Sequence, residues 1–322
     1  MEYARLGNTG LRVSRLALGC MTYGDPSRGL HGWTLDEEAS APFFRQAVEL
    51  GISFWDTANA YQQGTGEEYV GRAIRRFSRR EDIVLATKVS GKMHGGPGGS
   101  GLSRTAILEQ VDASLTRLGT DYIDVYYIHR FDPQTPVEET MQALDDIVRA
   151  GKVRYLGASS MFAWQFAKLQ TAAALNGWTK FAAMEDQYNL LKREEEREMI
   201  PMCADTGVGL VPYSPNGKGR LTRPNGHSTD RSRTDEVAKA FDTDADAAVI
   251  DVVEQVARER NVPMAQIALA WVLANPTVTA AIVGATKSHH LTDAVAALQI
   301  HLDPEEKARL EEPYVTQPPF WW

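Results

Sequence analysis

Cysteine is scarce in this sequence, with only Cys20 and Cys203 among 322 residues. Two cysteines so far apart give neither the framework of a disulfide-stabilised secreted domain nor the close spacing of a zinc site. No His-Glu-x-x-His segment is present, and the adjacent histidines at 289–290 are by themselves a weak indication of metal binding. The sequence therefore predicts no metal site, and its cysteine content fits a reducing cytosol.

Positively charged residues are fewer than negatively charged ones, and long apolar runs are absent. The chain has 34 Lys and Arg residues against 42 Asp and Glu residues, which gives a net charge of −8 at pH 7. Without a basic stripe, nucleic acid is not expected as a partner, because phosphate binding needs clustered cations. No apolar run could cross a bilayer, and the first residues, MEYARLGNTG, lack the basic-then-apolar order of a signal peptide. We therefore expect a cytoplasmic protein with no membrane segment.

Short β-type segments are what the chain has in abundance. The opening, YARLGNTGLRVSRLALG, alternates apolar and polar residues around a Gly-Asn-Thr-Gly turn, which predicts a hairpin leading into a first buried strand. Further apolar runs rich in β-branched and aromatic residues follow it. In total the sequence predicts eight strands, near residues 16–19, 52–57, 82–88, 122–129, 153–160, 181–187, 208–214 and 279–284.

Amphipathic helical segments separate these strands. Several have a glycine directly after the last turn, and Thr135 and Pro136 are placed as the N-cap and first helical residue of one helix. Eight alternations of strand and helix, with nearly continuous apolar strands, indicate parallel strands covered by helices, and the count of eight favours a closed barrel. Among the predicted helices are 37–50, 103–118, 137–150, 163–175, 194–205 and 289–298.

We therefore predict an α/β fold, a (β/α)8 or TIM barrel with an N-terminal β-hairpin and long mouth loops, as a single domain over residues 1–322. An open Rossmann-type sheet is the alternative, but the first strand continues as LALGCMTYGD, which lacks Gly-x-Gly-x-x-Gly spacing. Two segments break the alternation and are expected to be surface loops. Residues 91–101 are rich in glycine without the order of a phosphate-binding loop, and residues 220–244 are long enough for a lid or binding loop.

Ionisable residues stand at the ends of three successive predicted strands. Asp56, Lys88 and His129 hold these positions, and Tyr61 follows the first of them by five residues. Taken singly, each has an ordinary explanation, as a helix cap, a solvated lysine, a core histidine or a packing tyrosine. In a barrel, however, the carboxyl ends of the strands converge on one mouth, where catalytic residues gather. The coincidence predicts a site at that mouth.

The residue types suit proton transfer to a carbonyl oxygen. A tyrosine hydroxyl is a weak acid near neutral pH, and a nearby ammonium lowers its pKa by favouring the phenolate. Lys88 can supply that charge, and Asp56 can hold the ammonium in place. His129 can hydrogen-bond a substrate oxygen or share the proton.

Five segments resemble the aldo-keto reductase superfamily, in order and at similar spacing along the chain. Stretches such as GASSM, REEEREM, GRLTRP and QIALAWVL further resemble the bacterial branch that includes YajO. The resemblance implies reversible hydride transfer from NADPH to an aldehyde or ketone. It implies Tyr61 as the general acid, tuned by Lys88 and Asp56, with His129 as the orienting group. The five segments are GISFWDTANAY, VLATK, DVYYIHR, YLGASS and AIVGATKSHHL.

The resemblance also implies that NADP(H) lies in extended form across the barrel mouth. Ser159 would bond the nicotinamide carboxamide, and Tyr213 would stack on the ring. Lys287 beside Thr286 suits a 2′-phosphate, which favours NADPH over NADH, although the same segment can be an ordinary helix N-terminus. The positions implied to contact the cofactor are Gly19, Met21, Thr22, Asp56, Ser159, Ser160, Glu185, Gln187, Tyr213, Ser214, Pro215, Gly219, Leu221, Gly284, Thr286, Lys287, His290 and Asp293.

The chain departs from the family pattern at three places. Ser160 stands where many members have asparagine, and residues 216–218 replace a commoner Leu-Ala-x stretch along the pyrophosphate. Glu185 stands where the family usually has glutamine, with Gln187 two positions further on. Since an ionised glutamate can accept a hydrogen bond but cannot donate one, either Glu185 substitutes imperfectly or Gln187 takes its place.

Aromatic residues and a histidine on the predicted mouth loops are candidates for a substrate pocket, with ordinary packing as the equal alternative. The C-terminal Phe320–Trp322 segment is expected to dock on the barrel or on another subunit, so a homo-oligomer is possible. Two other functions stay open at this point, namely an NADPH-binding sensor or scaffold with little turnover, and an aldolase that forms a Schiff base on Lys88. The pocket candidates are Tyr23, Trp33, His94 and Phe131, together with Met21 and Trp164.

Overall fold

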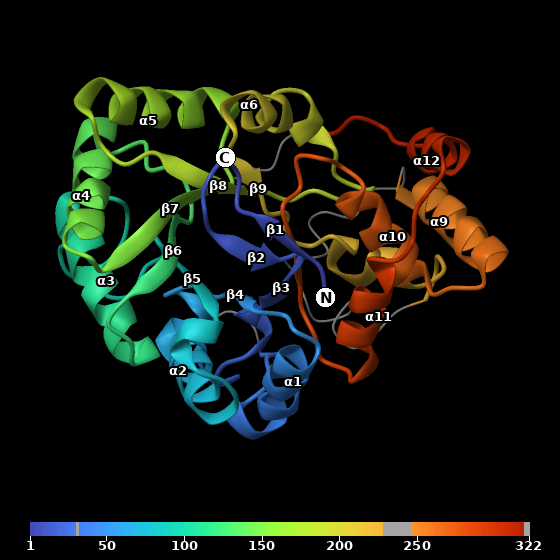
Figure 1. The fold of residues 1–322 in the computed structure, drawn as a ribbon, viewed down its shortest axis with the longest axis horizontal. Coiled ribbons are helices and arrows are strands. Elements are labelled where there is room, and N and C mark those ends of the chain that lie inside the picture. The colour runs from blue at the N-terminus through green and yellow to red at the C-terminus, as the bar shows by residue number, and fades with distance from the viewer. Residues whose placement is uncertain (30–31, 228–245, 319–322) are drawn as a thin grey trace.

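A computed structural model describes residues 1–29, 32–227 and 246–318 (Figure 1). Its main sheet has eight strands, all parallel, in the order β10-β3-β4-β5-β6-β7-β8-β9. The strands are apolar on both faces because each is covered on both sides. Their bounds are β3 Leu16–Gly19, β4 Phe54–Asp56, β5 Val84–Val89, β6 Ile123–Ile128, β7 Val153–Ser159, β8 Phe181–Glu185, β9 Gly209–Leu210 and β10 Ala281–Val283.

The sheet closes on itself between β9 and the segment that leads into β10. Leu210 pairs with Val278 in a parallel bridge, and the Thr279 amide donates to the Leu210 carbonyl at 2.8 Å. The predicted (β/α)8 barrel is therefore confirmed, and all eight predicted strands are present. The open Rossmann-type alternative is wrong, because an open sheet would leave the outer strands unpaired.

The barrel contains two apolar regions. One fills the inside of the ring with alternate strand residues, among them Ala17, Phe54 and Val125. The other lies between the strands and the surrounding helices and includes Leu18, Trp55 and Tyr126. Successive strand residues point to opposite faces, so each strand contributes to both regions.

An antiparallel hairpin of β1 (Tyr3–Arg5) and β2 (Arg12–Ser14) lies across one end of the barrel, as the sequence predicted (Figure 1). Leu6 and Val13 are fully buried and join the apolar region inside the ring. Because β2 runs directly into β3, the hairpin covers the amino ends of the strands. The carboxyl ends are left for the mouth.

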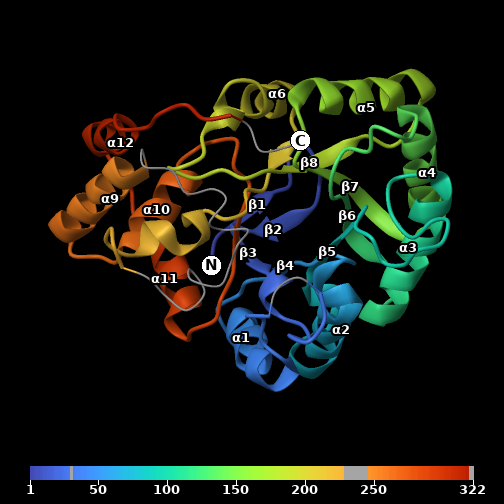
Figure 2. The same cartoon turned by 180° about the vertical axis from the view of Figure 1, so that it is seen from behind.

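Helices surround the barrel, as both views show (Figure 2). The side chains of Asp36 and Ser103 accept hydrogen bonds from the amides of Ala39 and Ala106. These N-caps fix the starts of α1 and α3. Four of the helices, α2, α9, α10 and α12, were not among those named from the sequence. The helices are α1 Glu37–Glu49, α2 Thr65–Phe77, α3 Arg104–Leu118, α4 Val137–Arg149, α5 Ala163–Asn176, α6 Met199–Thr206, α9 Asp246–Arg260, α10 Met264–Leu273, α11 His289–Ala297 and α12 Pro304–Glu311.

Two helix boundaries differ from the prediction. Helix α4 begins at Val137 with Pro136 as its N-cap residue, and the Thr135 hydroxyl donates to Asp132 at 2.8 Å instead of capping the helix. The single helix expected over 194–205 is a short 3-10 turn followed by α6, which carries Pro201 in its first turn, where proline is tolerated.

Of the two predicted surface loops, the structure describes only one in full. Residues 91–101 contain neither helix nor strand, as expected. Most of the predicted loop 220–244, and the C-terminal Phe320–Trp322 segment, lie outside the described residues. No helix in the described part of the chain is long and apolar enough to cross a bilayer.

Candidate active site

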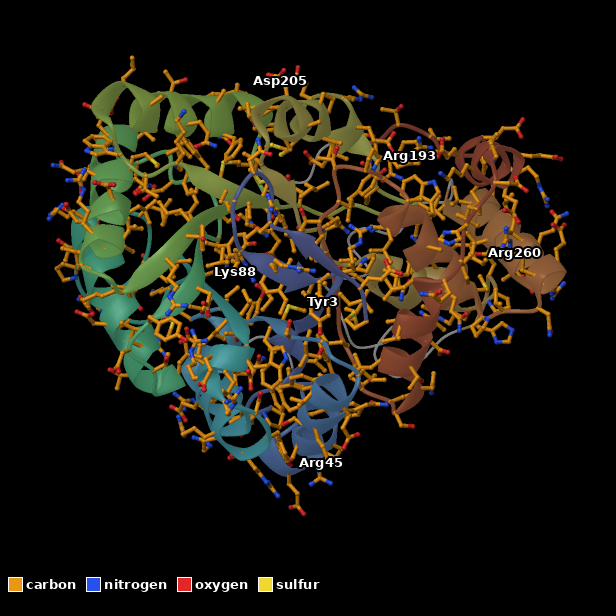
Figure 3. The ribbon with its side chains drawn as sticks, viewed as in Figure 1. Tyr3, Arg45, Lys88, Arg193, Asp205 and Arg260 are labelled. Atoms are coloured by element: carbon orange, nitrogen blue, oxygen red, sulfur yellow. The ribbon has the colours of Figure 1, made fainter. Side chains whose placement is uncertain are left out.

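Lys88 is the centre of the candidate site. Figure 3 shows it near the middle of the ring of strands, and its side chain is completely buried. The ammonium donates to both carboxylate oxygens of Asp56, at 2.7 and 2.6 Å, and to the Thr57 carbonyl at 3.0 Å. A buried charge is tolerated only when it is paired and hydrogen-bonded in this way.

The barrel register brings these residues together. Asp56 is the last residue of β4, and Lys88 lies two positions beyond the β5 residue that pairs with it, Ala86. Lys88 in turn pairs with Tyr127 on β6. Parallel neighbours in register thus place side chains from distant parts of the sequence at one level near the mouth.

The charge of Lys88 is strongly favoured. Burial alone would lower the pKa of the ammonium, but Asp56, Glu185 and Tyr61 outweigh burial and raise it well above its ordinary value. Lys88 is therefore a fixed cation over the whole physiological range of pH.

Tyr61 stands over this cation on the turn after β4. Its ring centroid is 5.4 Å from the Lys88 ammonium and 5.8 Å from the His129 ring, which it meets edge-on at 81°. No residue in the described ranges hydrogen-bonds the Tyr61 hydroxyl. The structure thus brings together all four residues, Tyr61, Lys88, Asp56 and His129, that the strand-end pattern predicted.

The acidity of Tyr61 differs from the simple expectation. Burial raises the pKa of its hydroxyl, and although Lys88 acts to lower it, Asp56 and Glu185 act to raise it further. The net direction of the Tyr61 pKa is upward, because burial is the largest effect and Asp56 and Glu185 add to it. Lys88 still favours the phenolate as expected, but it offsets burial only in part.

His129 is neutral in this environment. It follows β6 directly, and its backbone amide donates to the Val89 carbonyl at 2.8 Å. Burial, Lys88 and Arg130 lower the pKa of the imidazole well below its ordinary value. A neutral imidazole can donate one hydrogen bond to a ligand oxygen without adding charge.

Glu185 belongs to the same cluster, although the sequence assigned it only to the cofactor. It is the last residue of β8, and its Oε2 atom lies 3.4 Å from the Lys88 ammonium. Its position at a strand end was the signal that could have added it to the other three. Burial and then Asp56 raise its pKa to about 8, with Lys88 acting in the opposite direction.

A chain of hydroxyl groups lies beside Glu185. Ser159 pairs with Glu185 in the register of β7 and β8, and its hydroxyl is 3.0 Å from that of Ser160. The Ser160 hydroxyl in turn donates to the Tyr213 hydroxyl at 3.3 Å, while the Ser160 amide donates to Asp186 at 2.9 Å. Three of the residues implied for the nicotinamide end, Ser159, Ser160 and Tyr213, are therefore adjacent.

A second group gathers where β3 and β10 end. A Cβ atom on Gly19 would meet Ile282 at 2.8 Å, and one on Gly284 would meet the Thr22 hydroxyl at 3.2 Å. Thr286 and Lys287 are exposed just before α11, and the Thr286 amide donates to Nδ1 of His290 at 3.2 Å. Exposed hydroxyl and ammonium groups at a helix N-terminus are suited to a phosphate.

The remaining cofactor candidates lie on nearby segments. Gln187 pairs with Tyr213 through an isolated parallel bridge, and the Asp293 carboxylate accepts from Gln266 at 3.1 Å. Leu221 is fully buried, in the 3-10 turn Gly217–Thr222. Met21 lies in the turn after β3, and Ser214, Pro215 and Gly219 lie between β9 and Leu221.

The four pocket candidates lie in different environments. Tyr23 is fully buried, packs on Phe44, and donates to the Ala285 carbonyl at 3.1 Å, so it is a packing residue and has no surface for a substrate. His94 pairs with Glu109 of α3 at 2.6 Å. Trp33 is half-buried on the loop before α1, and Phe131 meets Trp164 edge-on with ring centroids 6.1 Å apart.

Among the described residues, no group of three His, Cys, Asp or Glu side chains could hold a metal ion. Both cysteines are buried and free. The described side chains that meet at the mouth are a buried lysine, two carboxyl groups, a tyrosine and a neutral histidine.

Comparison with known proteins identifies the family. Residues 15–314 match the family model described as the aldo/keto reductase family. The chain is 47% identical to the versiconal hemiacetal acetate reductase of Aspergillus parasiticus, over 98% of this chain and 97% of that protein. It is 43% identical to a putative aryl-alcohol dehydrogenase of Schizosaccharomyces pombe, over 98% and 96% of the two chains.

An aldo-keto reductase of Fusarium vanettenii is 44% identical over 99% of this chain and 92% of its own. These relatives are fungal, so the comparisons do not support the bacterial branch that motifs such as GASSM suggested. With a family model that spans most of the sequence, the chain belongs to the aldo-keto reductase family.

Proposed function

We propose that this protein reduces an aldehyde or ketone to an alcohol, with NADPH as the reductant. The observation that carries the proposal is the buried Lys88 ammonium, held by Asp56, beneath the rings of Tyr61 and His129. A fixed cation next to a tyrosine stabilises the phenolate that forms when the hydroxyl gives up its proton. Membership of the aldo-keto reductase family supports carbonyl reduction as the class of reaction.

Each residue then has one role at the carbonyl group. When bound, NADPH supplies the hydride that adds to the carbonyl carbon. Tyr61 donates a proton to the carbonyl oxygen, and Lys88 stabilises the resulting phenolate. Neutral His129 donates a hydrogen bond to the same oxygen and orients the substrate. Asp56 keeps the ammonium in place.

The residues present fit NADPH at both ends. The hydroxyls of Ser159 and Ser160 and the ring of Tyr213 form one polar and aromatic group next to the Lys88 cluster. Lys287 and Thr286 offer a cation and a hydroxyl at the start of α11, where the helix dipole also favours an anion. This donor set favours the 2′-phosphate form of the cofactor.

Aromatic carbonyl compounds are the substrate class that we favour. Trp164, at the start of α5, is 58% exposed and meets Phe131, two residues beyond His129. An exposed tryptophan so near a catalytic residue offers a stacking surface. The name of one relative, a putative aryl-alcohol dehydrogenase, supports the same class.

The alternative of a Schiff-base aldolase is disfavoured. A Schiff base requires a neutral lysine amine, whereas the environment of Lys88 raises its pKa and all three of its hydrogens face acceptors. A sensor or scaffold remains the second candidate. It predicts tight NADPH binding without turnover on a panel of aromatic and aliphatic carbonyl compounds.

Replacement of Tyr61 by phenylalanine tests the proposal directly. We expect Tyr61→Phe to lower kcat by about a hundredfold or more, the usual contribution of a general acid. The affinity for NADPH should change little, because the hydroxyl faces the substrate. The measurements are the absorbance of NADPH during turnover of an aromatic aldehyde and the quenching of tryptophan fluorescence on NADPH binding.

Tyr69→Phe is a matched control, because Tyr69 lies on α2 outside the cluster. The control should keep the kcat of the unmodified protein. If Tyr61→Phe reduced the aldehyde at an unchanged rate while binding NADPH, the assignment of Tyr61 as the acid would be wrong.

A further inference from the structure

Glu185 is a buried acid that has one carboxyl oxygen without a well-aligned hydrogen-bond donor. Its side chain is 3% exposed, and its Oε2 atom has no hydrogen-bond partner in the described part of the chain. The nearest cation, the Lys88 ammonium, lies 3.4 Å away and already donates its three hydrogens to Asp56 and Thr57. An ionised carboxylate at this place would lack the donors that a buried charge needs.

Burial is the main factor that disfavours ionisation of Glu185, and the negative charge of Asp56 adds to it. The cations that act in the opposite direction are the buried Lys88 and the exposed Arg130. Burial and then Asp56 raise the pKa of Glu185 to about 8, with Lys88 and Arg130 offsetting part of the increase. At neutral pH the side chain therefore retains its proton. The titratable and charged groups that face it are Asp56, Tyr61, Lys88, Tyr127, Arg130, Asp186 and Tyr213.

The position of Glu185 joins the Lys88 cluster to the residues proposed for the nicotinamide. Ser159 pairs with Glu185 in the register of β7 and β8, and the Ser160 amide donates to the backbone carbonyl of Glu185 at 3.0 Å. The Ser160 hydroxyl continues to Tyr213. A nicotinamide held by these residues would lie beside the Glu185 carboxyl group.

Building on the proposed function, we propose that Glu185 selects between the two redox forms of the cofactor through its own proton. The reduced nicotinamide ring is neutral, and the oxidised ring carries a positive charge. Protonated Glu185 accommodates the neutral ring and can both donate and accept hydrogen bonds. Binding of NADP+ favours the carboxylate, whose charge balances that of the ring, and releases the Glu185 proton to solvent.

The consequence is an affinity ratio that depends on pH. As pH rises through the pKa of Glu185, NADP+ binds more tightly relative to NADPH. Both forms carry the same 2′-phosphate, so titration of that group cancels in the ratio. The dissociation constants of the full-length protein for NADPH and NADP+ can be measured by tryptophan fluorescence across this range.

We expect the ratio Kd(NADPH)/Kd(NADP+) to rise about tenfold between roughly pH 6 and pH 9, as expected for one linked proton. In Glu185→Gln, an isosteric side chain that does not ionise, the ratio should stay constant. Glu198→Gln is the matched control, because it makes the same chemical change at an exposed position just before α6, outside the cluster. It should keep the pH dependence of the unmodified protein. Asp186→Asn removes the neighbouring buried carboxyl group, whose pKa burial raises well above its ordinary value, and tests whether that group is the source of the proton. The ratio should still rise with pH in this variant.

Titration calorimetry measures directly how many protons are released when the cofactor binds. In two buffers of different ionisation enthalpy near pH 7, we expect NADP+ to release up to about one proton from the unmodified protein and NADPH to release almost none. Glu185→Gln should release almost none with either form. Because the unmodified protein suffices for this measurement, it tests the proposal even if a variant folds poorly.

Three results would overturn the proposal. They are a constant affinity ratio in the unmodified protein, a ratio in Glu185→Gln that still rises with pH, or a dependence that disappears in Asp186→Asn instead. A constant ratio with normal binding of both forms removes the role of Glu185 but leaves the proposed reduction intact. Failure of both forms to bind at any pH removes the proposed function as well.

Discussion

At the scale of single residues, the turn that carries Tyr61 has an unusual backbone. Gln62 and Gln63, directly after Tyr61, have φ angles of 45° and 51°, in the left-handed region that side chains with a Cβ atom rarely adopt. Gly64 continues in the same region with φ of 92°. Strain of this kind persists when the surroundings hold a segment firmly, and it is concentrated at functional sites. Here the strained residues directly follow Tyr61, whose ring centroid lies 5.4 Å from the Lys88 ammonium.

Gln63 is exposed, so a substitution there probes the backbone without disturbing the core. We expect Gln63→Val to lower the free energy of unfolding by about 1 to 2 kcal/mol, because a β-branched residue is disfavoured at positive φ. It should also lower kcat, since relaxation of the turn moves Tyr61. Urea denaturation and NADPH oxidation measure the two effects.

Gln63→Asn is the control, because asparagine tolerates the left-handed region. It should keep both the stability and the kcat of the unmodified protein. Equal stability of the valine and asparagine variants would show that the turn is not held in this conformation.

At the scale of secondary-structure elements, Glu67 connects two helices to the barrel. It is fully buried on α2, accepts from the Thr87 hydroxyl of β5 at 2.6 Å, and pairs with Arg117 of α3 at 2.6 Å. The two helices also pack closely, since a Cβ atom on Gly71 would lie 2.1 Å from the Leu118 carbonyl oxygen. Thr87 precedes Lys88, so this connection holds the strand that delivers the ammonium.

Removal of the Glu67 charge should therefore destabilise the folded protein. We expect Glu67→Gln to lower the free energy of unfolding by about 3 kcal/mol, because it leaves the largely buried Arg117 without a counter-charge. Glu37→Gln, in the exposed pair of Glu37 with Arg72, should change it by less than about 0.5 kcal/mol. Denaturant unfolding of both variants gives the comparison, and equal effects would contradict this role of Glu67.

At the scale of the whole molecule, the alternation of predicted strands and helices along the sequence was sufficient to predict the barrel. Eight strands were identifiable because each is a short apolar run, and the hairpin because of its glycine-flanked turn. The candidate cluster was predictable for a related reason, since Asp56, Lys88 and His129 stand at or just after strand ends. What the sequence could not give depends on contacts between distant segments. Examples are the burial of the Tyr61 hydroxyl, which raises its pKa, and the burial of Tyr23.

The two ends of the barrel are expected to have different roles, with the hairpin end contributing to stability and the mouth to function. Leu6 of the hairpin region is fully buried at the end of the ring opposite the mouth. We expect Leu6→Ala to lower the free energy of unfolding by about 2 to 5 kcal/mol, the usual range for loss of a buried leucine side chain. The affinity for NADPH should stay the same at temperatures where the variant is folded, because the geometry at the carboxyl ends of the strands does not depend on this side chain.

Leu175→Ala is the matched control for this change, because Leu175 is 81% exposed on α5. It should change stability by less than about 0.5 kcal/mol. Thermal unfolding and fluorescence titration with NADPH separate the two properties. A Leu6→Ala protein that kept its stability but lost NADPH affinity would show that the hairpin end and the mouth are coupled. The expected result, lower stability with unchanged affinity, places the hairpin among the elements that close the barrel and leaves the chemistry to the opposite end.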